Sequence, residues 1–183
     1  ILAVPDTAIG AVTHEIVPTL KPGTMVVILD AAAPHAGHLP HRLDITYFVT
    51  HPCHPPIFND ETDLSAKGDH FGGIAAKQHI VNALMQGPES HYTLGEEVAR
   101  TIWAPVMRSH RITVEQMAIL EPGLSETVCA TLLAAMRDAM EEAIRRGVPR
   151  EAARDFLLGH MNILAAVTFE EINGQFSDAC NKA

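Results

Sequence analysis

The residues best suited to chemistry gather in one short stretch that follows an apolar segment. The segment Ile45–Val49 is β-branched and aromatic, which predicts a buried strand. Prolines punctuate residues 51–56, and a proline donates no hydrogen bond to a sheet ladder, so the strand must end there. His51, Cys53 and His54 therefore lie just past the carboxyl end of a strand, where open α/β sheets bind ligands. The alternative is a stiff surface loop with incidental histidines.

A second chemical candidate is Glu121, which stands in an apolar run next to a Pro-Gly pair that should break a helix. A buried carboxylate is costly unless it is paired or bound to a cation, so a metal is one explanation. The alternative is an exposed glutamate at a helical corner. Glu115 and Glu126 are further carboxylate candidates, and solvation explains them better.

The spacing His51-x-x-His54 allows two imidazoles to reach one metal, although this spacing alone is a weak signal. Cys53 could ligate a soft metal as a thiolate, or it could be a small buried residue, which is more common. His160 lies in a helical part of the sequence near an apolar face, where a core histidine is the simpler interpretation.

Composition sets limits on the function. The chain has 183 residues and a formal charge of -9, which disfavours a nucleic acid or an anionic membrane surface as partner. No apolar run is long enough to span a bilayer, and no secretion signal is evident, so we expect no membrane contact. Three widely spaced cysteines predict a reducing compartment, the cytoplasm, with no disulfide framework.

The N-terminal half has the order of a doubly wound fold. We expect strands at 1–4, 24–30, 45–49 and 78–85, with a helix from Asp6 or Thr7 to Val17. Short links around that helix make a βαβ unit with parallel strands. No Gly-x-Gly-x-x-Gly follows a strand, so the first nucleotide-binding part of such a sheet should be missing.

From Thr93 the sequence predicts helices. Thr93 with Glu96, and Thr113 with Gln116, have the spacing of helix-capping pairs. A long amphipathic helix should run from Ser125 to Arg146. The predicted fold class is thus α/β: the C-terminal half of a Rossmann-type parallel sheet followed by an all-helical domain. The predicted domains are a partial dinucleotide-binding domain at 1–90 and a helical substrate or dimerisation domain at 91–183.

Four segments carry a resemblance to a known family. Val-Pro-Asp at 4–6, the loop at 50–56, Leu-Glu-Pro-Gly at 120–123 and Gly-His-Met-Asn at 159–162 resemble the D-apionate oxidoisomerases, which are 6-phosphogluconate dehydrogenase-like proteins. The run Glu115–Leu120 is also similar to a helix of ketol-acid reductoisomerases. In those enzymes an aspartate four residues before the glutamate helps to bind magnesium. Arg111 stands at that place here, so the reductoisomerase magnesium pair is broken.

The resemblance implies NAD-dependent oxidation of a branched sugar acid, coupled to rearrangement of its carbon skeleton. It implies a divalent metal, with zinc expected, held by His51 and Glu121. Pro5 and Asp6 would lie near the nicotinamide ribose of NAD, and His54 is our candidate proton carrier. The substrate would be a small sugar acid such as D-apionate, and the helical domain would form a homodimer.

Two other functions remain open at this point. The protein could be a simple NAD(P)-dependent hydroxyacid dehydrogenase without rearrangement, or the helical half could be a dimerisation module without catalysis. Product analysis and the solution mass would separate these possibilities from an oxidoisomerase.

Overall fold

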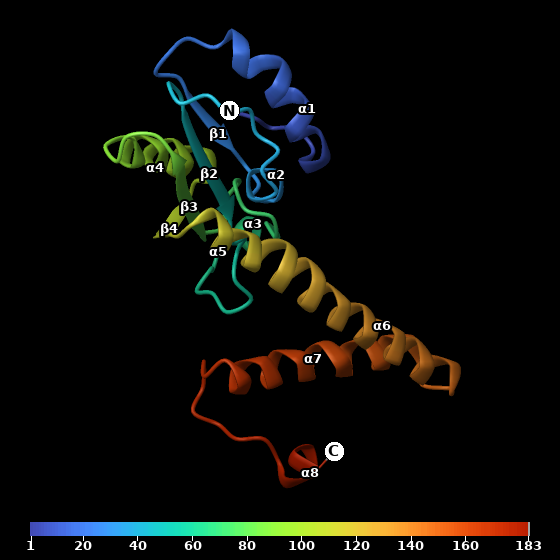
Figure 1. The fold of residues 1–183 in the computed structure, drawn as a ribbon. Helices are drawn as coiled ribbons and strands as arrows, with labels where there is room; N and C mark the ends of the chain where they lie inside the picture. Colours follow the sequence, from blue (N-terminus) through green and yellow to red (C-terminus); the bar gives the residue numbers. More distant parts are fainter. Residues whose placement is uncertain (183) are drawn as a thin grey trace. The chain divides into compact units, whose positions relative to one another are not determined.

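A computed structural model describes residues 1–182 of the chain (Figure 1), which divide into two compact units, one at 1–126 and one that begins at Thr127. The first unit contains a sheet of four strands in the order β1 (Met25–Ile28), β2 (Thr46–Pro52), β3 (Gln78–Gln86) and β4 (Val106–Arg111). Its helices are α1 (Asp6–Ile16), α2 (Ala32–His35), α3 (Leu64–Lys67), α4 (His91–Ile102) and α5 (Val114–Ala118).

The sheet is mixed. Strands β1 and β2 are parallel, as expected, and so are β3 and β4, but β3 runs antiparallel to β2. The chain between β2 and β3 contains one four-residue helix, α3, and it returns alongside β2 as an antiparallel neighbour. The α/β class and the helical C-terminal part are therefore confirmed, and the purely parallel arrangement is corrected.

Alternating side chains of the strands pack into two hydrophobic clusters on opposite faces of the sheet. Tyr47 and Val49 belong to the cluster that includes Ile9 of α1 and Met117 of α5. Phe48 belongs to the other cluster, which includes Ala99 of α4. In Figure 1, α4 accordingly lies on one side of the sheet and α1 on the other. Because strand side chains alternate between faces, His51 follows Tyr47 and Val49 toward α5.

Several predicted boundaries differ from the structure. The expected strand at 1–4 is a single bridge, in which the Leu2 N–H donates to the Val27 carbonyl oxygen over 2.8 Å. The expected helix beyond Thr93 ends at Ile102, and residues 106–111 form β4 because their backbone pairs with the exposed edge of β3. The region 91–183 is therefore not all helical, and the compact units meet at 126/127 rather than at 90/91.

Pro122 does not break the helix, contrary to the sequence-based expectation. After α5 the chain continues as a π-helical segment (Ile119–Cys129) and then as α6 (Ala130–Arg145). Proline lacks the N–H that an α-helical turn requires, and a widened π turn accommodates this loss. The capping pair Thr113–Gln116 at the start of α5 is confirmed, whereas α4 begins at His91 without a side-chain cap.

The second unit is helical over its described residues. Its elements are α6, α7 (Arg150–Thr168) and α8 (Asp178–Lys182). No large apolar side chain of α6 or α7 is fully buried, and Leu132, Phe156 and Ile163 are among those that are exposed. The stretch Val114–Arg145 is also long and apolar enough to cross a membrane by length and composition, which the sequence analysis had not expected.

An aspartate organises the loop between β2 and β3. The Asp69 carboxylate accepts hydrogen bonds from the backbone N–H groups of Gly72, Ile74, Ala75 and Ala76, over 2.9–3.1 Å. These N–H groups, that of Ala75 first, lower the pKa of Asp69 against the opposing effect of burial. The same loop carries Phe71, whose backbone contacts the candidate site.

We expect Gly95→Ala to destabilise the fold by about 1–3 kcal/mol, because a Cβ at Gly95 would lie 2.3 Å from the buried Phe48 ring. Gly159→Ala is the matched control, since a Cβ there meets nothing within 4 Å. This second change should stabilise its helix by about 0.5–1 kcal/mol. Urea unfolding of both variants is the measurement, and equal effects would contradict the close packing of α4 on β2.

We expect Asp69→Asn to lower the thermal unfolding midpoint near neutral pH. The midpoint of the variant should also fall less than that of the wild type as the pH is lowered. A carboxylate with a lowered pKa contributes stability above its ordinary pKa of about 3.9, and this contribution disappears as the pH falls through the lower folded value. Melting curves between about pH 6 and about pH 3 test the expectation. Asp60→Asn is the control, because Asp60 is an exposed partner of Lys77 in the same loop and should contribute little.

Candidate metal and active site

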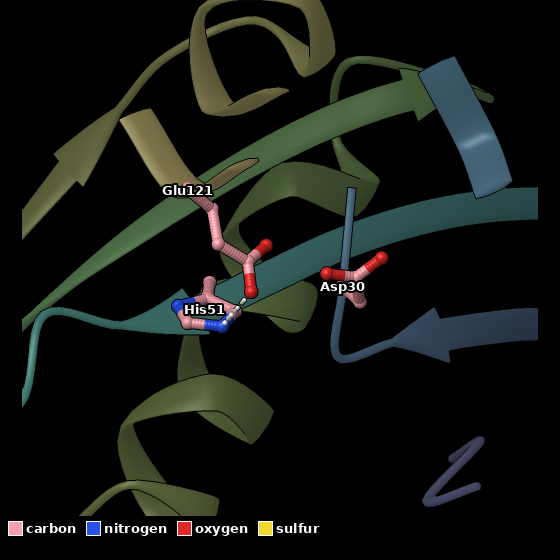
Figure 2. Close-up of side chains that lie close together, drawn as sticks. All are labelled: Asp30, His51 and Glu121. Carbon is pink, nitrogen blue, oxygen red and sulfur yellow. Dashed lines mark ion pairs between the residues drawn. The ribbon is translucent and has the colours of Figure 1, made fainter. Parts of the chain in front are cut away.

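The structure brings His51 and Glu121 together. The His51 Nε2 atom lies 2.9 Å from the Glu121 Oε1 atom, and both side chains are mostly buried. His51 comes from the carboxyl end of β2 and Glu121 from the first turn of the π-helical segment, so 69 residues of chain separate two groups in contact (Figure 2). The contact brings together the two residues that the family resemblance implies as metal ligands.

The tautomer of His51 follows from its second ring nitrogen. The Nδ1 atom lies 2.8 Å from the Pro52 carbonyl oxygen, which can only accept a hydrogen bond, so Nδ1 carries a proton. The Nε2 atom is then the group that either donates a second proton to Glu121 or offers a lone pair. Burial lowers the pKa of His51, but the hydrogen bond and the charge of Glu121 outweigh burial and raise it overall.

A third group, Asp30, was missed in the sequence analysis. It lies two residues beyond the end of β1, is 4% exposed, and faces the pair in Figure 2. One ligand atom from each of Asp30, His51 and Glu121 lies within 4.8 Å of the other two. A charged residue directly after an apolar strand was the signal that could have found it, since β1 and β2 are parallel neighbours whose ends share an edge.

The carboxyl groups of Asp30 and Glu121 shift each other's pKa. Burial, and then the adjacent Glu121 carboxylate, raise the pKa of Asp30 to about 7, although the Ala32 N–H favours the charged form. Burial also acts to raise the pKa of Glu121, but the contacts with His51 and Asp30 lower it overall. The Oε2 atom of Glu121 is buried and has no hydrogen-bond partner among the described residues. A buried oxygen without a partner costs free energy, so Oε2 is an open acceptor for a proton or a cation.

A cavity of about 480 Å³ opens beside this cluster. His51, Cys53, His54, Glu121 and Glu126 line it, together with apolar side chains from β3 and the helix that follows β4. Its size is that of a small-molecule site. Cys53 is a free thiol in its wall, and no disulfide is formed by the three cysteines.

His54 adopts a strained backbone conformation with φ at 60°, which is uncommon for a residue other than glycine. Its Nδ1 atom lies 2.8 Å from the Phe71 carbonyl oxygen, so Nδ1 is protonated and Nε2 is the basic nitrogen of the neutral ring. The ring centroids of His51 and His54 are 6.1 Å apart.

The remaining candidates lie elsewhere. Pro5 and Asp6 begin α1, and Asp6 lines a separate hollow of about 490 Å³ with residues of α2. Ala32, two residues after Asp30, also lines this hollow. His160 is exposed and stacks on Phe156 with ring centroids 4.0 Å apart, so the prediction of a core histidine was wrong. Glu115 is an exposed residue in the first turn of α5.

The donor set suits a divalent cation. Imidazole and carboxylate together are ligands that zinc accepts, and carboxylates are preferred by calcium, magnesium and manganese. The His51 Nε2 atom and the Glu121 Oε1 atom lie where one ion could replace the proton between them, and the Oε2 atom of the same carboxylate is unpartnered among the described residues. The residues present therefore fit a bound metal.

Comparison with known proteins shows which proteins the chain is similar to. The chain is 77% identical over 183 residues to a D-apionate oxidoisomerase from Rhizobium rhizogenes, covering all of this chain and 66% of that protein. A solved semialdehyde dehydrogenase NAD-binding protein from Cupriavidus necator, in complex with calcium and NAD, is 71% identical with a TM-score of 0.97. The match covers 100% of this chain and 66% of that one. The expected resemblance to these proteins is confirmed.

A more distant structure supports the fold alone. An NADH-preferring ketol-acid reductoisomerase from an uncultured archean has a TM-score of 0.62 at 17% identity, covering 92% of this chain and 49% of that one. The family model described as phosphogluconate dehydrogenase (decarboxylating) C-term matches residues 59–183, which include Glu121. The chain therefore belongs to the phosphogluconate dehydrogenase C-terminal family.

Proposed function

We propose that this chain carries the metal and substrate site of an NAD-dependent oxidoisomerase that acts on a branched sugar acid of the D-apionate class. The observation that carries the proposal is the His51–Glu121 contact at the wall of a cavity of about 480 Å³. The relatives named D-apionate oxidoisomerase support the substrate class. The three unpaired cysteines support a reducing compartment, and we place the protein in the cytoplasm.

In this proposal His51 and Glu121 hold a divalent cation. The Pro52 carbonyl keeps the proton of His51 on Nδ1, so that Nε2 presents its lone pair. Zinc is our first candidate because one ligand is an imidazole. Calcium is the alternative, because the related Cupriavidus necator protein was solved in complex with this oxygen-preferring ion. A metal at this place would polarise a carbonyl oxygen of the substrate as a Lewis acid.

His54 is the proposed proton acceptor. The Phe71 carbonyl fixes the proton on Nδ1, which leaves Nε2 free to take the proton of a substrate hydroxyl. Bound NAD would supply the hydride acceptor for the carbon that bears this hydroxyl. Pro5 and Asp6 are proposed to lie near the nicotinamide ribose, as the family resemblance implies, and the hollow that Asp6 lines is shared with Ala32, two residues after Asp30.

The test uses the intact protein with NAD and D-apionate. We expect His51→Ala and Glu121→Gln to lower metal affinity by more than about 100-fold, since even the partners of metal ligands contribute about 10–100-fold. We expect His54→Gln to retain metal and to lower kcat by about 10²–10⁴-fold, the usual contribution of a general base. Metal content by mass spectrometry and NADH absorbance are the two measurements.

His41→Gln serves as the control, because His41 is an exposed histidine of the same unit that lies outside the cavity. Full metal occupancy in both His51→Ala and Glu121→Gln would refute the metal assignment. Turnover of D-apionate to an unrearranged ketone would replace the oxidoisomerase by a simple hydroxyacid dehydrogenase.

We also propose that the helical unit forms a homodimer. An apolar groove of about 570 Å³ lies between α6 and α7, and Met136, Met140, Phe156 and Leu157 are among its lining residues. Exposed apolar patches of this kind mark an interaction surface. A membrane is the less suitable cover, because the chain carries a charge of -9 and the same helical stretch contains Glu121, which pairs with His51.

We expect Phe156→Asp to shift the protein from dimer to monomer, because the charge would have to be buried against the apolar surface of the second copy. Glu151→Gln, in the first turn of the same helix, should leave the mass unchanged. Light scattering coupled to gel filtration measures both. A monomeric wild-type protein at micromolar concentration would refute the dimer.

A further inference from the structure

We propose that Asp30 is the third protein ligand of the cation at the His51–Glu121 site. The proposal rests on the metal-binding function proposed above and adds to it a residue from a different strand. Asp30 sits just beyond β1, so that β1, β2 and the helical segment after α5 would each contribute one donor.

The distances fit a single ion. Two ligands of one ion can be separated by at most twice the metal–ligand bond, about 4.0–5.2 Å for bonds of about 2.0–2.6 Å. The three donor atoms of Asp30, His51 and Glu121 lie within 4.8 Å of one another, and the His51–Glu121 distance is 2.9 Å. All three can therefore contact one ion placed between them with little movement of the backbone.

The fixed orientation of Asp30 supports ligation. Its Oδ1 atom accepts a hydrogen bond from the Ala32 N–H over 2.7 Å, which anchors the carboxyl group by one oxygen. The carboxyl group thereby faces the His51–Glu121 pair, as Figure 2 shows, and Oδ2 is the oxygen not used by Ala32. This arrangement is that of a ligand whose direction is set by a backbone contact.

Charge gives the second argument. A buried ion pair needs one carboxylate for one imidazolium, and Asp30 adds a second carboxylate at 4% exposure. Among the described residues, no arginine or lysine pairs with this cluster in the ion pairs that the structure contains. A divalent cation balances two carboxylates and satisfies the orphaned Oε2 atom of Glu121, whereas the His51–Glu121 ion pair alone leaves the second carboxylate without a balancing charge.

A consequence concerns the choice of metal. Two carboxylates and one imidazole form a mostly oxygen donor set, which binds manganese and calcium as well as zinc. Removal of the Asp30 charge should weaken the binding of manganese more than that of zinc, because the imidazole contributes most to the zinc complex.

The test measures Mn²⁺ binding to the intact protein by electron paramagnetic resonance, in which the free ion gives the signal. The variant is Asp30→Asn, which keeps the shape of the side chain and an oxygen for the Ala32 N–H. We expect its Mn²⁺ affinity to fall by more than about 100-fold, beyond the loss of about 10–100-fold that partners of ligands cause, with a smaller loss for Zn²⁺. Glu115→Gln, which removes one charge at the exposed start of α5, should change the affinity by less than about threefold, since remote charges are screened.

The outcomes separate the two proposals. If the wild-type protein binds neither Mn²⁺ nor Zn²⁺, the proposed metal function fails. If the wild-type protein binds Mn²⁺ and Asp30→Asn binds it with a loss below about 100-fold, the metal function stands and the ligand role of Asp30 is overturned.

A crystal structure of the Mn²⁺-loaded wild-type protein covers the case in which Asp30→Asn does not fold. An Asp30 oxygen within about 2.6 Å of the anomalous peak supports the proposal. A hydrogen bond from Asp30 to a water molecule on the metal, with no direct bond, overturns it.

Discussion

The site depends on the cost of keeping two carboxyl groups out of water beside a single imidazole. Asp30 and Glu121 approach His51 from two different elements, and burial works against the charge of each. His51 compensates one carboxylate over 2.9 Å. The second carboxyl group has no positive partner in the part of the chain that the structure describes. As a result the pKa of Asp30 is about 7, and a buried Glu121 oxygen has no partner among the described residues. A proton or a cation must meet this imbalance, and that requirement is the physical basis of the proposed metal site.

Strand alternation, a helix-capping pair and a π-helical segment hold these groups at fixed positions. The alternation of β2 directs Tyr47 and Val49 into the core beneath α1 and α5, and it turns His51 to the same side. The Thr113–Gln116 capping pair fixes the start of α5, which brings Glu121 over the sheet one turn after that helix ends. The π-helical segment accommodates Pro122 without a break, and widened turns of this kind are frequent at functional sites.

The loop after β2 positions His54, the proposed proton acceptor. Asp69 collects four backbone N–H groups, and the adjacent Phe71 carbonyl fixes the tautomer of His54. The positive φ of His54 is a strained conformation that the surrounding loop must maintain. In the second unit, by contrast, many apolar side chains of α6 and α7 are exposed, and a partner surface would satisfy them better than water does.

The sequence by itself determined the α/β class, the strand before the proline-rich loop, and His51 and Glu121 as two separate candidates. These followed from local signals: a β-branched run ended by prolines, and a carboxylate in an apolar stretch. The pairing of His51 with Glu121 was implied by the family resemblance. Only the tertiary structure decided the rest. The strand β4 forms because its backbone pairs with the free edge of β3, although its sequence continues a helical pattern. Asp30 joins the site because parallel neighbours end at one edge of the sheet, a proximity that 20 residues of intervening chain conceal.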